Sequence, residues 1–389
     1  MRLLIISHTP HYLKQNTIVG WGPTVREIDH LSQLFRKVVH IAPLHGGVAP
    51  ASAAPYTSSN LQVHSIAPAS SKLQLAFHLP GYIKAITQEA RSADVIHVRC
   101  PANISAVAIC LLPFLRKPAV RWLKYAGNWR PRENDSWGYG LQRWWLRHRF
   151  HRGFVTVNGD WPGDPGHIHP FLNPCLTNAE LTEARELGTE KQLKEPVQIL
   201  FVGRLEKAKG VQRSLNIVER LVREGIQVSL DLVGDGPQRA QFEQATAKLG
   251  ISEFVKFHGW LPRTVLPTLY ESAHFLLLPT SSSEGWPKVL GEAMAYGVVP
   301  VSTNVSSIPQ YLRRFETGRT FEPQDLEGFV GAFRWYAAHP EIWKEESLRG
   351  MKAAVGFTYD AYVTQVRALM NLPSIDSKMK TNLEKTSSV

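Results

Sequence analysis

The fold is indicated most clearly by Ala273-His-Phe-Leu-Leu-Leu278 and, after a loop, by Pro287-Lys-Val-Leu-Gly-Glu-Ala-Met-Ala-Tyr-Gly297. The first run is almost continuously apolar, as a strand covered on both faces should be. In the second run proline suits the first helical position, and apolar residues recur at helical spacing as far as the glycine. A further apolar run, 298–301, follows. We therefore expect a strand, a loop, a helix and a second strand of a parallel sheet.

The intervening loop, Thr280-Ser-Ser-Ser-Glu284-Gly285-Trp286, leads into the open N-terminus of the expected helix. Unpaired backbone N–H groups at such an end bind phosphate or sugar oxygens. Glu284 in the loop and Glu292 beyond the first helical turn can accept hydrogen bonds from vicinal hydroxyls. The stretch therefore predicts a sugar or nucleotide site, although a charged loop before an exposed helix face is the simpler alternative.

The length and composition are those of a globular protein with two domains. The chain has 389 residues, of which 43% are hydrophobic and 20% charged. Its three cysteines are odd in number and lack metal-ligand spacing, which favours a reducing compartment. The first apolar run is too short for the core of a signal peptide, and no later run is long enough to span a membrane. We expect a cytoplasmic protein.

The positive charge is concentrated in the first half. Residues 1–172 contain 19 Lys and Arg against 8 Asp and Glu, so the whole formal excess of +11 lies there. This distribution points to an anionic partner or surface for that half alone.

The first half opens with the pattern of a strand, a glycine-containing loop and a helix. Leu3 to Ile6 is apolar, Gly20-Trp-Gly22 falls in the loop, and a helical pattern runs from Val25 to Leu34. Strand and helix patterns then alternate, which predicts a parallel sheet with ligands at the carboxyl ends of its strands. Two glycines before a helix also fit a plain turn.

The segment from Arg121 to Arg152 interleaves aromatic and basic residues. Its Trp and Tyr side chains, among them Trp144, alternate with Arg and Lys side chains such as Arg143 and Arg147. The mixture fits stacking on sugars, contact with a bilayer surface or contact with nucleic acid. The alternative is an ordinary helix over 141–150 whose apolar parts pack inward.

The boundary between the domains is expected where the composition changes. Residues 163–174 are rich in Gly, His and Pro, and residues 178–195 are polar and charged. We expect a Rossmann-like first domain over 1–172, completed by a C-terminal helix over 359–372, a linker over 173–196, a Rossmann-like second domain over 197–358 and a flexible tail over 374–389. Histidines near the boundary raise a metal site as an alternative, but a His-x-His pair without cysteine at ligand spacing is more often part of a loop.

Two strands of the second half end in glycine-containing turns. The run 197–202 ends in Gly203-Arg204-Leu-Glu-Lys-Ala-Lys209-Gly210, and the run 228–233 ends in Gly234-Asp-Gly-Pro237. Arg204 and Lys209 follow a strand end, where paired cations can neutralise a diphosphate. By themselves they would also fit a solvated charge run.

These signals, in this order, resemble the retaining glycosyltransferases of family 4. The resemblance rests on Gly203-Arg204 with Lys209-Gly210, on Val233-Gly-Asp-Gly-Pro237, and on Glu284 and Glu292 with seven residues between them. It covers residues 197–318 well and the first half loosely. It implies an α/β protein in the GT-B arrangement, with two Rossmann-like domains facing each other across a cleft.

The resemblance also implies the roles of individual residues. Arg204 and Lys209 would bind the donor diphosphate, Glu292 the nucleotide ribose, and Glu284 the donor sugar beside the reacting carbon. Backbone N–H groups beyond Glu284 would help to hold sugar and phosphate, and they belong to Gly285, Trp286, Lys288 and Val289. Gly20 and Gly22 match loosely the glycine loop that faces the donor in that family.

One position departs from the family pattern. The family often carries His-Gly after the strand that corresponds to residues 119–123, whereas this chain has Lys124-Tyr125-Ala126-Gly-Asn128. A histidine-assisted step is therefore in doubt, and Tyr125, Lys124 or Asn128 is expected to line the same place.

The sequence thus predicts a retaining glycosyltransferase that moves a sugar from a nucleotide-sugar to a hydroxyl acceptor, without a metal or other cofactor. The basic first half would face the acceptor, a lipid-linked or growing cell-surface glycan, at the anionic inner face of a membrane. The rivals are a nucleotide-sugar epimerase, a sugar phosphorylase, and a non-catalytic or RNA-binding protein. The presence of Arg204, Lys209, Glu284 and Glu292 argues against a degenerate site, and we expect no nucleic-acid partner.

Overall fold

The computed structural model describes residues 1–131, 136–282 and 284–372 of the chain. The tail expected over 374–389 lies outside these residues, as do part of the Trp- and Arg-rich segment, 132–135, and Ser283 of the predicted site loop.

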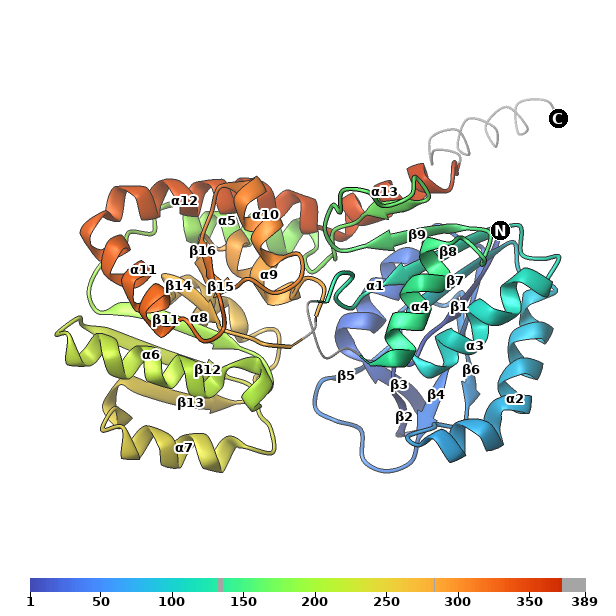
Figure 1. Ribbon diagram of the computed structural model, residues 1–389, viewed down its shortest axis with the longest axis horizontal. Helices are drawn as coiled ribbons and strands as arrows, with labels where there is room; N and C mark the ends of the chain where they lie inside the picture. The colour runs from blue at the N-terminus through green and yellow to red at the C-terminus, as the bar shows by residue number, and fades with distance from the viewer. Residues whose placement is uncertain (132–135, 283, 373–389) are drawn as a thin grey trace.

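The first half folds as a sheet with helices on its faces (Figure 1). Its strands are β1 (Arg2–Ile6), β2 (His11–Lys14), β3 (Thr17–Trp21), β4 (Lys37–His45), β5 (Ala53–Pro55), β6 (Leu61–Ile66), β7 (Val95–Cys100), β8 (Val120–Tyr125), β9 (Phe154–Val157) and β10 (Ile168–Pro170). The order is β10-β9-β8-β7-β1-β4-β2-β3-β5, and β6 pairs with β4. The helices are α1 (Gly22–Ser32), α2 (Lys72–Ala90), α3 (Asn103–Leu111) and α4 (Trp137–Arg147).

The second half forms a separate parallel sheet. Its strands are β11 (Val197–Val202), β12 (Val228–Val233), β13 (Val255–Gly259), β14 (Phe275–Leu278), β15 (Val299–Thr303) and β16 (Arg319–Phe321), in the order β13-β12-β11-β14-β15-β16. Its helices are α6 (Val211–Arg223), α7 (Arg239–Lys248), α8 (Leu266–Ser272), α9 (Lys288–Ala295), α10 (Ile308–Phe315), α11 (Leu326–Ala338) and α12 (Pro340–Ala353). The expected α/β class with two mainly parallel sheets is confirmed.

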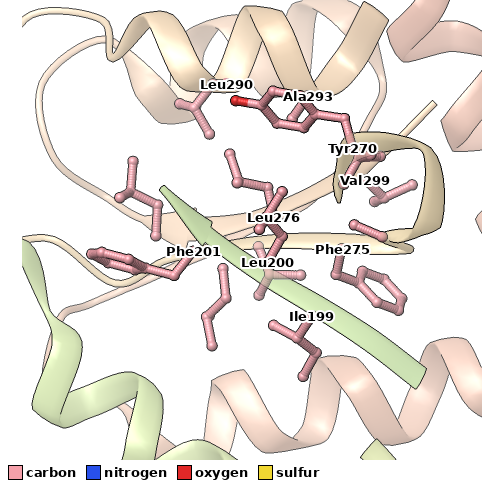
Figure 2. Close-up of a cluster of buried hydrophobic side chains, with 14 of the residues drawn as sticks. Ile199, Leu200, Phe201, Tyr270, Phe275, Leu276, Leu290, Ala293 and Val299 are labelled. Atoms are coloured by element: carbon pink, nitrogen blue, oxygen red, sulfur yellow. The ribbon is translucent and has the colours of Figure 1, made fainter. Parts of the chain in front are cut away.

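Burial on both faces explains the apolar strands of the second sheet (Figure 2). Leu200 of β11 and Leu276 of β14 are fully buried, and Leu290 of α9 covers them from one side. Each fully buried leucine side chain is worth roughly 1.5–3 kcal/mol relative to its exposed state. The apolar run 273–278 and the helix that begins at Lys288 therefore lie at the centre of this core.

Two helices outside the ranges 1–172 and 197–358 belong to the cores of the two domains. The expected linker contains α5 (Asn178–Thr189), an N-capped helix whose Leu181 and Ala184 belong to the second core. The chain then returns after α12, and α13 (Tyr359–Leu369) packs Tyr362 and Val366 against Leu3 of β1 (Figure 1). The first sheet is thus covered in part by the C-terminal end of the described chain.

The expected glycine loop before α1 is instead a β-hairpin formed by β2 and β3. Gly20 lies in β3 and pairs with His11 of β2, and Gly22 is the first residue of α1. A Cβ atom on Gly20 would lie 2.7 Å from Nε2 of His11, and one on Gly22 would lie 2.7 Å from the carbonyl oxygen of Ser52. Close packing within the first domain therefore explains both glycines.

The Trp- and Arg-rich segment divides into a buried part and an exposed part. Trp122 and Tyr125 of β8 are buried in the first core, and the guanidinium of Arg121 donates hydrogen bonds to main-chain carbonyl oxygens. Trp137 and Trp144 of α4 are exposed. The single interaction surface expected over 121–152 is thus wrong for its first part, because β8 lies inside the sheet.

Across the described residues, no helix combines the length and the apolar character that crossing a bilayer requires.

Candidate active site

The predicted site loop lies between the two domains. Its Glu284 forms a β-bridge with Gly127, just beyond β8, and the N–H of Gly285 donates to the carbonyl oxygen of Ala126 at 3.2 Å. A Cβ atom on Gly285 would lie 2.2 Å from Nδ2 of Asn158, at the end of β9. Glycine thus allows the loop to touch the carboxyl-end edge of the first sheet.

Lys209 and Glu284, two of the predicted site residues, contact each other. Lys209 ends the 3-10 helix η2 (Lys207–Lys209), which follows β11, and its ammonium forms an ion pair with Oε1 of Glu284. The next residue, Gly210, has φ 91°, and a Cβ atom there would lie 2.1 Å from the carbonyl oxygen of Pro279. This tight turn presents the lysine to the loop after β14.

Arg204 lies on the same loop but has a different ion-pair partner. Its side chain is 70% exposed and pairs with Glu206 at 2.7 Å. The guanidinium is therefore available for a new partner, because a surface ion pair of this kind contributes little.

Glu292 is buried and engaged by two protein groups. Oε1 accepts a hydrogen bond from Nη1 of Arg263 at 2.7 Å, and Oε2 accepts one from the hydroxyl of Tyr270 at 3.2 Å. Arg263 also contacts Glu180 of α5 at 3.0 Å. Burial raises the pKa of Glu180, but hydrogen bonds and charge from Arg263 outweigh it and lower that pKa to about 2. Because a carboxylate offers about four acceptor positions, Glu292 keeps acceptor capacity.

Two of the remaining predicted residues contribute by packing. Trp286 is buried, and its ring stacks on Phe357 with centroids 5.3 Å apart. Only its backbone could meet a ligand, so a contact through its side chain is excluded. Val289 packs against the second core.

A charged cluster around Glu27 of α1 was not predicted from the sequence. This carboxylate is buried and accepts hydrogen bonds from Arg99 of β7 at 2.7 Å and from Lys124 of β8 at 2.6 Å. Lys288, the first residue of α9, reaches the other oxygen at 3.1 Å, and the Tyr362 hydroxyl donates to the first at 3.3 Å. The cluster therefore joins the two domains beside the site loop, and it gives the lysines at 124 and 288 a common partner.

A second missed group is a polar network at the carboxyl end of β1, beside the middle of β4. Ser7 Oγ lies 2.7 Å from Nε2 of His40, and the hydroxyl of Tyr56 lies 2.9 Å from Nδ1 of His40 and 2.9 Å from Nε2 of His11. Burial, then the positive charges of His11, Arg99 and His97, holds the pKa of His40 well below its usual value. His40 is therefore neutral near pH 7.

Tyr125, Asn128 and Lys124, which were expected to line the place of Ala126, each have a partner within the protein. Nη1 of Arg143 donates to the hydroxyl of Tyr125 at 2.8 Å, and Oδ1 of Asn128 accepts the N–H of Arg130 at 3.1 Å. Lys124 belongs to the Glu27 cluster. In the described ranges, no three His, Cys, Asp or Glu side chains gather closely enough to hold a metal ion.

Comparison with known proteins matches the second half of the chain to one family. Residues 185–352 match the family model described as glycosyl transferases group 1. The chain is 32% identical over 140 residues to a lipopolysaccharide 1,6-galactosyltransferase of Salmonella typhimurium, covering 35% of this chain and 38% of that protein. It is 30% identical over 141 residues to the amylovoran biosynthesis glycosyltransferase AmsK of Erwinia amylovora, covering 35% of each.

The similarity in fold extends over nearly the whole chain. The sucrose-phosphate synthase of Thermosynechococcus elongatus superposes with a TM-score of 0.71 at 18% identity, over 95% of this chain and 98% of that one. By sequence, the aligned part spans about two-fifths of the length of the curated relatives. Residues 185–352 thus resemble the glycosyl transferases group 1 family, and the two sheets have the GT-B fold.

Proposed function

We propose that the protein is a retaining glycosyltransferase of family 4 that moves a sugar from a nucleotide-sugar to a hydroxyl acceptor. The observation that carries this proposal is the Lys209–Glu284 pair at the point where the site loop meets Gly127 of the first domain. A carboxylate and an ammonium are thereby placed at the carboxyl ends of two neighbouring strands of the second sheet, beside the first domain, where such folds bind their ligands.

The leaving diphosphate is held by cations of the second domain. Lys209 is in place, and Arg204 exchanges its weak contact with Glu206 for the diphosphate. Glu284 contacts the donor sugar, and Glu292 accepts hydrogen bonds from the ribose with its remaining lone pairs. Developing charge on the leaving group is stabilised by these fixed cations and by the N–H groups of Lys288 and Val289 at the start of α9, whereas the N–H of Gly285 is engaged by Ala126.

The transfer therefore proceeds without a metal or another cofactor. We expect full activity in the presence of EDTA, since Lys209 and Arg204 perform the neutralisation that a divalent cation performs elsewhere. The measurement is sugar transfer with and without chelator. Loss of transfer on chelation, with recovery on addition of Mg²⁺ or Mn²⁺, would contradict this part of the proposal.

The acceptor side is the first domain, working in the cytoplasm at the inner face of a membrane. Relatives of the second domain include proteins named for lipopolysaccharide and amylovoran synthesis. Helix α3 packs between α2 and α4, and both outer helices carry exposed apolar side chains, Leu73 and Phe77 on α2 and Trp137 and Trp144 on α4. With the excess positive charge of residues 1–172, they support an anionic bilayer and a lipid-linked or growing cell-surface glycan as acceptor.

The test is a screen of nucleotide-sugars for thermal stabilisation and donor hydrolysis, because a bound ligand stabilises the folded state by mass action. A donor that stabilises the protein should also be transferred to an added acceptor with retention. An epimerase would interconvert the donor without an acceptor, and a phosphorylase would depend on phosphate. Salt-dependent RNA binding without sugar transfer would favour the RNA-binding alternative.

A further inference from the structure

The Glu27 cluster contains more positive charge than its carboxylate can neutralise. Three cations, Arg99, Lys124 and Lys288, contact Glu27, and within the described residues it is the one carboxylate that forms an ion pair with them. The exposed fractions of these side chains are 12%, 5% and 22%, against 1% for Glu27. The cluster thus has a formal charge of +2 in a site largely removed from water.

Such an imbalance is costly in a purely structural ion pair. Removing an ammonium or guanidinium from water costs several kcal/mol unless an opposite charge compensates it. Burial lowers the pKa of Lys124 to about 7, against the raising effect of Glu27, and the charges of Arg99 and Lys288 lower it further. A cluster selected for stability alone would carry balanced charges or apolar side chains.

The cluster also has unused hydrogen-bond donors. A lysine ammonium has three N–H donors and an arginine guanidinium has five. Lys124 and Arg99 each donate to one carboxylate oxygen of Glu27, and Lys288 donates to Glu27 and to the carbonyl oxygen of Pro23 at 3.3 Å. Arg99 and Lys288 retain the larger exposed fractions, so the solvent side of the cluster is lined by donors.

The position of the cluster indicates which ligand it serves. Lys124 lies three residues before Gly127, which bridges to Glu284, and Lys288 begins the helix that follows the site loop. Cations of both domains therefore meet at Glu27, and Lys124 and Lys288 lie three and four residues from the two residues of this bridge.

We infer that Arg99, Lys124 and Lys288 form an anion-binding subsite for a phosphate group, in which Glu27 is a positioning residue that holds the three cations together. The inference rests on the proposed function in so far as that phosphate belongs to the donor diphosphate or to a phosphate-bearing acceptor. It places part of the phosphate binding on the first domain, in addition to Arg204 and Lys209 of the second.

The first experiment measures the binding of inorganic pyrophosphate to the full-length protein by calorimetry. Lys124→Met and Arg99→Met should each weaken it by tenfold or more, since a charge-assisted contact is lost while Glu27 keeps two cationic partners. The matched controls, Lys84→Met and Arg91→Met, change exposed residues at α2 and should bind as the parent does. Unchanged pyrophosphate affinity in folded Lys124→Met and Arg99→Met would overturn the subsite.

A second variant tests the positioning role of Glu27. Glu27→Gln removes the charge that gathers the three cations, so pyrophosphate affinity should fall by threefold or more, and added pyrophosphate should raise the melting temperature of this variant less than that of the parent. A cluster that serves stability alone would lose melting temperature with no change in pyrophosphate affinity. If Glu27→Gln fails to fold, the Lys124→Met and Arg99→Met measurements decide.

Measuring the binding of a series of nucleoside diphosphates identifies the source of the phosphate. If Lys124→Met weakens both pyrophosphate and the nucleoside diphosphate, the subsite serves the donor. If it weakens pyrophosphate alone and raises KM for a phosphate-bearing acceptor, the subsite serves the acceptor. Either result supports the subsite. Failure of every nucleotide-sugar to be transferred would contradict the proposed function, and the pyrophosphate result would stand independently of it.

Discussion

Among single residues, Lys209 and Glu284 show which side-chain contacts short sequence motifs can predict. They are separated by 75 positions in the chain, yet each follows a buried strand, and β11 and β14 are neighbours in the sheet. The carboxyl ends of adjacent parallel strands must meet, so the contact could be predicted from the pattern. Glu27 could not be predicted in this way, because its partners lie 72, 97 and 261 positions away and it resembles any charged residue of a helix.

Removal of the cations of the β11 loop should abolish most of the transfer. We expect Lys209→Ala and Arg204→Ala each to lower kcat/KM by about two orders of magnitude or more, since each removes a contact that strengthens as the diphosphate leaves. The measurement is steady-state transfer with a donor identified by the screen. Lys207→Ala, an exposed residue of the same loop, is the control. Near-normal turnover in both site variants would remove them from the donor site.

Glu292→Gln should mainly weaken nucleotide binding. The substitution keeps the shape but removes the charge that pairs with Arg263, while Glu180 continues to hold that arginine. We expect nucleoside diphosphate affinity to fall by roughly 1.5–3 kcal/mol, the usual value of a hydrogen bond to a charged group. Calorimetry measures the affinity, with exposed Glu183→Gln as the control. A lower melting temperature with unchanged affinity would show that Glu292 is purely structural.

At the level of helices and strands, buried apolar elements could be predicted and partly exposed strands could not. The continuous apolar runs at β11 and β14 and the helical spacing of α9 agree with the structure, because these elements are buried in the second core. The hairpin β2–β3 was missed, since its strands are partly exposed and the expected loop glycines lie within it. Helix α5 was taken for a linker because its polar residues concealed the inward-facing Leu181.

The exposed apolar side chains of α2 and α4 give a prediction about membrane binding. Arg143 donates to Tyr125, and Arg147 pairs with Asp164 at 3.4 Å, so replacing these arginines would disturb the first domain. Phe77 and Trp144 are better targets because they are exposed.

The double variant Phe77→Ser, Trp144→Ser should bind vesicles of anionic lipid about tenfold more weakly or worse, since two interfacial apolar anchors are lost. Donor hydrolysis should be unchanged, whereas transfer to a lipid-linked acceptor should fall. Vesicle sedimentation measures binding, with exposed Leu348→Ser on α12 of the second domain as the control. Parent-like sedimentation of the double variant would exclude this face as the membrane contact.

For the molecule as a whole, buried neutral histidines in both domains predict acid sensitivity. Burial, then the charge of His167, lowers the pKa of His151 to about 3, and burial, then the charges of Lys191 and Lys194, lowers the pKa of His274 to about 4. The unfolded chain binds protons first as the pH falls below about 6.5. Stability is therefore intact above that pH and is lost progressively toward the folded pKa values.

We expect the free energy of unfolding to fall by about 1.4 kcal/mol per pH unit for each such histidine in that window. Urea denaturation at a series of pH values from roughly 7.5 to roughly 4.5 covers this window and measures the slope. Nδ1 of His274 accepts the N–H of Gln198 at 3.0 Å, and an asparagine oxygen can replace that acceptor. His274→Asn should thus flatten the slope, and an unaltered slope would show that His274 does not contribute.

The return of α13 to the first sheet has a consequence for biosynthesis. Tyr362 and Val366 share one buried cluster with Leu3 and Ile5 of β1. A nascent chain that has released only the first domain from the ribosome still lacks part of that core, whereas the second domain is complete before α13 emerges. We therefore expect the N-terminal domain to finish folding after the C-terminal one, with the apolar residues beneath α13 exposed to solvent until then.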